Sequence, residues 1–185
     1  YGTLAYLPRL KALWYRWNIY AWEWIKYVKS SQIVHPKQRY KSEEYKSLID
    51  KHDVVSFDIF DTLLYRTVSH PADVFTLMEP YVKEICSIKL FHEVRIEAER
   101  AARGISTAED ITFPDIYAMM NVDHSAKEKL MDCEKNMEFL VLRRDVMMAD
   151  LFEYALKHQK KVLIVSDMYQ SSAFLKEALQ KAGIS

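Results

Sequence analysis

The chain has 185 residues, of which 50% are hydrophobic and 28% are charged, and its acidic and basic residues balance to a formal charge of zero. This composition is typical of a globular protein and too apolar for a disordered one. Glycine occurs only at positions 2, 104 and 183, which excludes a dinucleotide-binding loop, a P-loop and the nucleophile elbow of α/β-hydrolases. Cys86 and Cys133 form no C-x-x-C pair. Neither a secreted disulfide scaffold nor a structural zinc site is indicated, and we expect a cytoplasmic protein.

The neutral total hides a division of charge near residue 52. Residues 1–52 hold ten Lys or Arg and four Asp or Glu, whereas residues 53–185 hold sixteen and twenty-two. Such asymmetry indicates two parts with different roles. Because the chain starts at Tyr1 without a methionine and stops just after Gly183, we also expect it to be a fragment of a longer protein.

Residues 8–29 contain all four tryptophans and predict an amphipathic helix. Its apolar face is formed by residues at spacings of three and four, namely Leu10, Trp14, Trp17, Ala21, Trp24 and Val28. A face of this size needs cover, and we favour contact with protein over contact with lipid. The alternative is a helix lying in the interface at the inner face of the membrane, where Trp, Lys and Arg are favoured. Nucleic acid is not an expected partner, since the tryptophans do not alternate as they do on a strand-based stacking platform.

Two short β-branched runs predict buried parallel strands. Residues 54–57 lead into Asp58, and residues 162–165 lead into Ser166. The second run is followed by a predicted helix over residues 171–181 that Gly183 ends. Before the first run, a polar linker leads into a short helix that ends near His52.

Almost everything between the two strands is predicted to be helical. Apolar residues recur at three-and-four spacing in five segments, Asp73 to Ile85, Phe91 to Arg103, Phe113 to Met120, Ala126 to Leu142 and Val146 to His158. This stretch is far longer than a direct crossover between parallel strands requires. We therefore predict an α/β fold, in which a large helical subdomain is inserted between two parallel strands. An N-terminal aromatic helix and linker (1–52) precede it.

The candidate catalytic and binding residues lie at the ends of the two predicted strands. Asp58 and Ser166 both follow a predicted parallel strand, and ligands of open α/β sheets bind beyond the carboxyl ends of such strands. A carboxylate there can ligate Mg²⁺ through one oxygen and attack phosphorus with the other. Ser166 can donate its hydroxyl to a phosphoryl oxygen. Asp167 begins the loop that faces the same space, and its alternative role is to cap the helix that follows.

The runs VVSFDIFDTLL and VLIVSDMY resemble the first two motifs of the haloacid dehalogenase-like (HAD) hydrolase superfamily. In that family, a helical cap inserted between these motifs closes over the active site. The resemblance thus implies a partial Rossmann-like parallel sheet (53–66 and 159–185) with a large all-helical cap (67–158) inserted after its first strand. Together with RIEAERAAR, the two runs are similar to a bacterial subgroup that is associated with glycosyltransferases of surface-polysaccharide synthesis. The resemblance covers residues 52–185 and implies a phosphorylated sugar or polysaccharide precursor as substrate. It also implies a glycosyltransferase domain or subunit as partner.

The resemblance implies a role for each matching residue. Asp58 would be the nucleophile and a ligand of the cofactor Mg²⁺, and Phe60 would give its main-chain carbonyl to the metal. Thr62 would orient the loop, and Ser166 would bind the phosphoryl group. Phe60 stands where the family's phosphatases carry a second Asp that protonates the leaving group. Asp61, one position later, is the candidate replacement, although we expect it to cap the turn.

Two functions follow as alternatives. The first is a Mg²⁺-dependent phosphohydrolase or phosphotransferase that acts through an aspartyl-phosphate. The second is a catalytically silent module that positions a glycosyltransferase partner or contacts the membrane. The second is favoured by Phe60 and by the lack of a counterpart in this sequence to the family's lysine and later acidic motif. These two motifs would lie downstream of Ser185, and their presence there would favour the enzyme.

A charge network is also predicted in the helical insertion. Arg95, Glu99 and Arg103 are spaced by four, as are Glu134 and Glu138 on another helix. We expect this network to be structural, with a substrate-reading role for Arg95 or Arg103 as the minor alternative.

Overall fold

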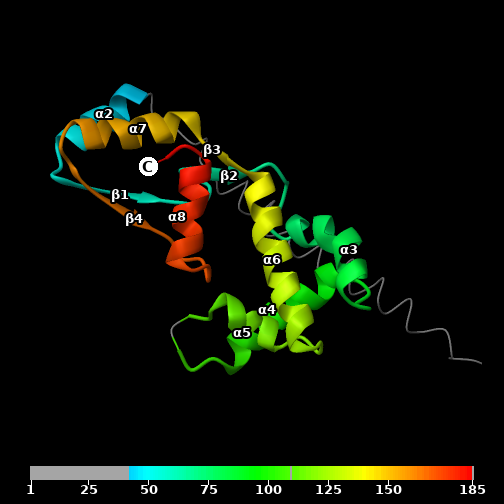
Figure 1. Cartoon of the computed structure of the whole chain (residues 1–185). Helices are drawn as coiled ribbons and strands as arrows, with labels where there is room; N and C mark the ends of the chain where they lie inside the picture. Colours follow the sequence, from blue (N-terminus) through cyan, green and yellow to red (C-terminus); the bar gives the residue numbers. More distant parts are fainter. Residues whose placement is uncertain (1–41, 109, 185) are drawn as a thin grey trace, which may run out of the picture. The chain divides into compact units, whose positions relative to one another are not determined.

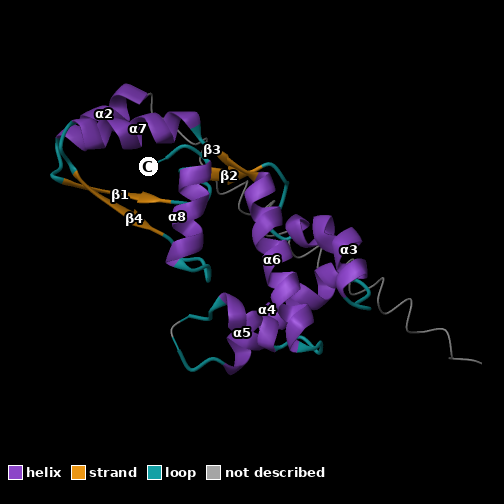
Figure 2. Ribbon diagram, viewed as in Figure 1, coloured by secondary structure: helices purple, strands orange, loops and turns teal. Residues whose placement is uncertain are grey.

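The computed structural model describes residues 42–108 and 110–184, which belong to one compact unit. These residues form seven helices, one parallel pair of strands and one antiparallel pair (Figures 1 and 2). The fold is therefore mixed α/β. None of the described helices has the length and apolarity that crossing a membrane requires. The predicted aromatic helix over residues 8–29 lies outside the described residues, and its contact with protein or membrane stays a prediction.

The parallel pair consists of β1 (Val54–Asp58) and β4 (Lys161–Val165). The register runs from Val54 opposite Lys161 to Asp58 opposite Val165. β-Branched residues favour this extended conformation because their side chains pack well on a pleated surface. The pairing confirms the prediction that the two strands, which lie far apart in the sequence, are parallel neighbours.

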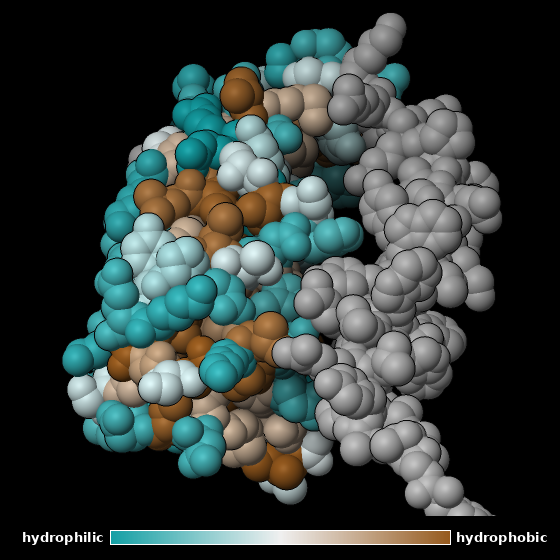
Figure 3. Space-filling view, turned by 90° about the vertical axis from the view of Figure 1, so that its right-hand side faces the viewer, coloured by the Kyte–Doolittle hydropathy of each residue, from teal (hydrophilic) through white to brown (hydrophobic). Residues whose placement is uncertain are grey.

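The prediction that both strands are buried is wrong for most of their residues. In β1 only Phe57 is buried, and Val54 is 50% exposed. In β4, Leu163 is 45% exposed and Val165 50%. The reason is that each strand has a single neighbour among the described residues, so one edge of each strand lacks a partner there. Figure 3 shows apolar residues gathered between hydrophilic ones on one face of the molecule.

Two helices lie together beside the parallel pair (Figure 1), α2 (Ser42–Asp50) and α7 (Val146–Lys157). The hydroxyl of Tyr154 donates to the carboxylate of Asp50, and Lys160 Nζ donates to the carbonyl of Asp50. The shared hydrophobic core takes residues from both strands and flanking helices, among them Ile49, Phe57, Leu63, Phe152, Phe174 and Leu179. Residues 42–50 thus pack with the sheet.

The second core belongs to helices α3 (Asp73–Ile85), α4 (Phe91–Ile105), α5 (Phe113–Ala118) and α6 (His124–Val141). Side-chain caps mark where α5 and α6 begin. Thr112 and Asp115 form a capping box at α5, and Asp123 caps α6 by accepting from the N–H of Ala126. The helices bury their apolar stripes against one another in a cluster separate from the first, which includes Val74, Met78, Val82, Phe91, Ile116 and Leu130. Four of the five predicted helices make up this body.

The fifth predicted helix, α7, corrects the boundary of the insertion. We expected the insertion to run from residue 67 to 158, but α7 contributes Ala149, Leu151 and Phe152 to the core around the sheet. The insertion therefore comprises residues 67–141. It begins and ends at an antiparallel pair, β2 (Leu64–Arg66) and β3 (Leu142–Arg144).

The β2–β3 pair was not predicted, and helix was expected as far as Leu142. Each strand has only three residues, which is too short for a recognisable alternation. Main-chain bonds extend the pair at both ends. Thr67 donates its N–H to the carbonyl of Val141 (2.9 Å), and Asp145 donates to that of Leu63 (2.9 Å). The pair fixes the two points at which the chain enters and leaves the insertion.

Gly183 and Gly104 allow a matched test of the end of α8 (Ser172–Lys181). Gly183 has a φ of 76°, and the N–H of the buried Ile184 that follows it donates to the carbonyl of Leu179. Gly183→Ala should lower the free energy of unfolding by about 1 kcal/mol, because an L side chain is strained in the left-handed region. Gly104→Ala, in α4 with nothing within 4 Å of the added carbon, should raise it by about 0.5 kcal/mol.

Urea denaturation of both variants measures this difference. Equal effects of the two substitutions would contradict the described end of α8.

Candidate functional site

The parallel register brings the two polar strand ends together. Asp58, the last residue of β1, lies opposite Val165, the last residue of β4, and Ser166 follows directly. Asp58 is exposed to solvent and Ser166 is half-buried. A carboxylate and a hydroxyl thus lie at adjacent strand ends, which is the edge at which open α/β sheets bind ligands.

The loop after β1 turns back on itself within a few residues. Thr62 donates its hydroxyl to Asp58 Oδ2 over 3.5 Å, and the N–H of Leu64 donates to the carbonyl of Ile59 over 2.8 Å. We expected Asp61 to cap this turn with its side chain. Its contribution lies in the backbone, since a φ of 56° puts Asp61 in the left-handed region, which Asp tolerates better than most residues. Its carboxylate is exposed and has no hydrogen-bond partner within the described part of the chain.

The ring of Phe60 is packed against other side chains and is not free at the strand end. The residue is buried, and the guanidinium carbon of Arg66 lies 4.5 Å from the centre of its ring. Arg66 in turn makes a two-pronged ion pair with Glu138 of α6, with N–O distances of 2.9 and 3.2 Å. Burial raises the pKa of Glu138, while the bonds from Arg66 oppose that rise. Phe60 therefore serves packing at this position, and its hydrocarbon ring has no proton to give to a leaving group.

The loop after β4 is held by its own polar groups. Ser166 Oγ accepts a hydrogen bond from the N–H of Met168 at 3.3 Å. Ser171, not Asp167, caps α8 by accepting from the N–H of Phe174 at 3.2 Å. Asp167 is exposed, so the alternative role that we considered for it, as the helix cap, is excluded. The hydroxyl hydrogen of Ser166 stays available for a ligand, because Ser166 uses its oxygen as an acceptor in this bond.

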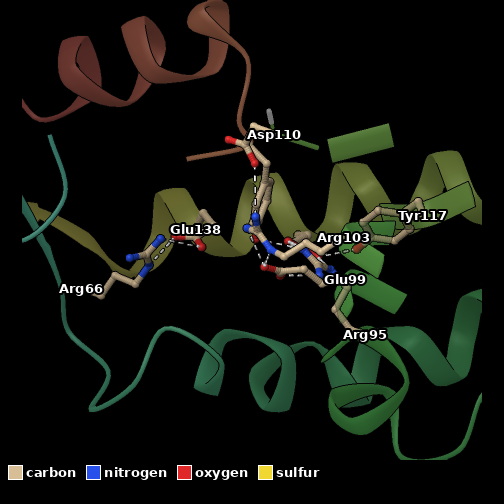
Figure 4. A network of polar contacts seen from close by, with 9 residues as sticks. Arg66, Arg95, Glu99, Arg103, Asp110, Tyr117 and Glu138 are labelled. Atoms are coloured by element: carbon tan, nitrogen blue, oxygen red, sulfur yellow. Dashed lines mark hydrogen bonds and ion pairs between the residues drawn. The ribbon is translucent and has the colours of Figure 1, made fainter. Parts of the chain in front are cut away.

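The predicted charge network exists, and its centre is buried instead of solvated (Figure 4). Arg95 and Glu134 are both 0% exposed and make two hydrogen bonds of 2.8 and 2.9 Å. Arg95 also donates to Glu99 at 3.2 Å, and Glu99 accepts from Arg103. Burial disfavours the charged guanidinium, yet the attraction of Glu134 holds the pKa of Arg95 above its ordinary value. A substrate-reading role for Arg95 is therefore excluded.

Two tyrosines complete the buried network, and neither was predicted to take part in it. Tyr117 of α5 donates its hydroxyl to Glu134, and Arg95 donates to the hydroxyl of Tyr169 at 2.9 Å. Burial raises the pKa of both phenols, which stay protonated at neutral pH. Tyr169 belongs to the loop after β4. Its position in VLIVSDMY was visible in the sequence, but its partner on another element was not.

Asp58 and Phe60 are the two described residues that the resemblance implies as magnesium ligands. The carboxylate of Asp58 and the main-chain carbonyl of Phe60 are hard oxygen donors of the kind that Mg²⁺ prefers. Among residues 42–108 and 110–184, no group of three or more His, Cys, Asp or Glu side chains could hold a metal ion. These two oxygens fit the ion chemically but leave most of an octahedral shell to water.

The buried ion pair gives a prediction about stability. Arg95→Met should lower the free energy of unfolding by about 3–5 kcal/mol, because it leaves Glu134 buried without its partner. Arg100→Met, on the same helix, is the matched control. Arg100 pairs with Glu97 at the surface, where the two side chains are 59% and 67% exposed, so the change should be below about 1 kcal/mol.

Thermal or urea unfolding of both variants decides this prediction. A small effect of Arg95→Met would contradict the described burial of the pair.

Comparison with known proteins gives no match from which the role of the site could be inferred. No protein-family model matches the chain, and no curated protein matches it. The site is therefore described by its arrangement, in which an exposed carboxylate and a half-buried hydroxyl lie at the ends of two neighbouring parallel strands.

Proposed function

We propose that the chain is a HAD-like, Mg²⁺-dependent phosphohydrolase or phosphotransferase that acts through an aspartyl-phosphate on Asp58. The observation that carries the proposal is the parallel register of β1 and β4, which sets Asp58 beside the residue before Ser166. A nucleophilic carboxylate and a hydroxyl donor at one sheet edge are the parts that phosphoryl transfer needs. The motifs around both residues agree with this chemistry.

The proposed first step forms one bond and breaks another. An oxygen of the Asp58 carboxylate attacks phosphorus, and the bond between phosphorus and the leaving oxygen breaks, so that the leaving group departs with the electron pair. Ser166 donates its hydroxyl to a phosphoryl oxygen and holds the group in line. Mg²⁺, when bound, neutralises negative charge on the phosphoryl oxygens.

In the second step, an acceptor removes the phosphoryl group from Asp58. Water as acceptor gives inorganic phosphate and hydrolysis, whereas a hydroxyl of another molecule gives transfer. Either acceptor loses a proton as its oxygen bonds to phosphorus, and the carboxylate of Asp58 is restored. Asp61 is the exposed carboxylate nearest in sequence to Asp58, and we propose it as the group that exchanges protons with the leaving group or acceptor.

We propose a phosphorylated sugar or a polysaccharide precursor as the substrate and a glycosyltransferase domain or subunit as the partner. Both proposals rest on the similarity of FDIFDTLLYR, RIEAERAAR and VSDMY to the subgroup described above. We further propose a cytoplasmic location, with contact at the inner face of the membrane through residues 8–29 as the alternative to protein contact.

A silent, partner-binding module is the second candidate function, and one observation favours it. The position next but one to Asp58 is held by Phe60, whose side chain has no ionisable proton and is buried under the guanidinium of Arg66. A module of this kind would keep the fold and the helical insertion while transferring no phosphoryl group.

A phosphorylation assay separates the two functions. With Mg²⁺ and acetyl phosphate, a small phosphoryl donor, the chain should gain one phosphoryl group that hydroxylamine removes, as expected of an acyl phosphate. Asp58→Asn should abolish this gain, because an amide is not a nucleophile of this kind. Asp53→Asn, the same change at the opposite end of β1, should leave it unchanged. Intact-mass spectrometry measures the modification, and a wild-type chain that never gains the group would overturn the enzymatic proposal in favour of the module.

Magnesium binding gives an independent prediction. Isothermal titration of the chain should detect only weak Mg²⁺ binding, because two protein oxygens leave most of the coordination shell to water. Asp58→Asn should remove the binding heat. Tight binding that survives this substitution would place the metal elsewhere.

A further inference from the structure

Both loops of the candidate site are connected to the same helix. The loop after β1 reaches α6 through Arg66, which pairs with Glu138. The loop after β4 reaches α6 through Tyr169, whose hydroxyl accepts from Arg95 while Arg95 pairs with Glu134. Figure 4 shows Arg66 and Glu138 toward one end of the drawn network and Arg95 and Tyr117 toward the other, along α6.

The two glutamates are spaced for one face of the helix. Residues four apart in an α-helix lie one above the other, so Glu134 and Glu138 present their carboxylates to neighbouring positions. Both glutamates are buried. Charges are costly to bury without partners, and each glutamate therefore holds its arginine in a defined place.

Tyr169 is held by more than its hydroxyl. Its carbonyl accepts the N–H of Phe113 at 3.2 Å, and its ring stacks on the ring of Phe113 with centres 6.0 Å apart. One residue before Tyr169 in the sequence, the N–H of Met168 donates to Ser166 Oγ. The contacts of the insertion with Tyr169 thus act on the same short loop that carries the hydroxyl of Ser166.

Arg66 acts in the same way on the other loop. Its guanidinium covers the ring of Phe60, which follows Asp58 in the turn. Leu64, whose N–H closes this turn onto Ile59, lies in the same short strand as Arg66. The ion pair with Glu138 therefore fixes the turn that begins at Asp58.

We propose that α6 is a common brace for the two loops, and that Tyr169 and Arg66 are positioning residues for Ser166 and Asp58. The brace sets the separation of Asp58 and Ser166. Its structural role is independent of the proposed function, whereas its role in phosphoryl transfer rests on that function. The helical insertion thus takes part in forming the site, through buried contacts that join both loops to one rigid element.

Tyr169→Phe tests the first half of the brace. The substitution removes the hydroxyl that meets Arg95 and keeps the ring that stacks on Phe113, so the protein should fold. Amide hydrogen exchange at Met168 should become about tenfold faster, as expected for the loss of one hydrogen bond to a charged group. The matched control is Tyr117→Phe, which removes a hydroxyl from the same network within the insertion and should leave exchange at Met168 unchanged.

Two results would overturn this half of the proposal. One is unchanged exchange at Met168 in Tyr169→Phe. The other is equal acceleration in both variants, which would mean that the network only stabilises the fold.

Arg66→Lys tests the second half. Lysine keeps the charge and loses the planar fork that binds Glu138 through two bonds, so amide exchange at Leu64 should accelerate. Arg143→Lys is the control, because Arg143 lies in the paired strand opposite Tyr65 and is exposed. Unchanged exchange at Leu64 in Arg66→Lys would refute the role of Arg66.

A kinetic measurement links the brace to the chemistry. If Asp58 accepts a phosphoryl group from acetyl phosphate, Tyr169→Phe should lower the rate constant of phosphorylation while Tyr117→Phe does not. If Asp58 accepts none, the proposed function fails, and the exchange measurements still decide whether the brace exists.

Discussion

The buried ion pair of Arg95 and Glu134 is the interaction on which the rest of this structure depends. Two charges without solvent exposure are tolerated only when each finds a partner and their remaining hydrogen-bonding capacity is filled. Glu134 accepts hydrogen bonds from Arg95 and Tyr117. Arg95 also donates hydrogen bonds to Glu99 and Tyr169. These contacts come from α4, α5, α6 and the loop after β4, so one charge pair joins the helical insertion to the sheet edge.

The sheet positions the residues of the candidate site, and side chains of the insertion contact the segments that carry them. The parallel register of β1 and β4 determines that Asp58 and Ser166 share one edge. Beyond that edge, Arg66 pairs with Glu138 of α6, and Tyr169 accepts a hydrogen bond from Arg95 of α4, which in turn pairs with Glu134 of α6. The helical body has a hydrophobic core of its own and is inserted after β2.

Local patterns in the sequence were enough to predict much of the fold and the polar ends of the strands. The spacing of apolar residues predicted helices such as α3 with its observed bounds, and the β-branched runs predicted the parallel pair. The β2–β3 pair could not be predicted, because three-residue strands carry too little pattern and their partners are distant in the sequence. The exposure of Val54 and Val165 depends on how many strands flank them. The role of Tyr169 required knowing which helix its hydroxyl meets.

The central claim is that Asp58 and Ser166 form one phosphoryl-transfer site. A crystal structure of the chain with Mg²⁺ and beryllium trifluoride, which mimics a phosphoryl group on a carboxylate, tests it most directly. The account predicts the beryllium atom on an oxygen of Asp58, with a fluorine within hydrogen-bonding distance of Ser166 Oγ. Beryllium trifluoride bound to another carboxylate, or an Asp58 left without it at saturating concentration, would contradict the account.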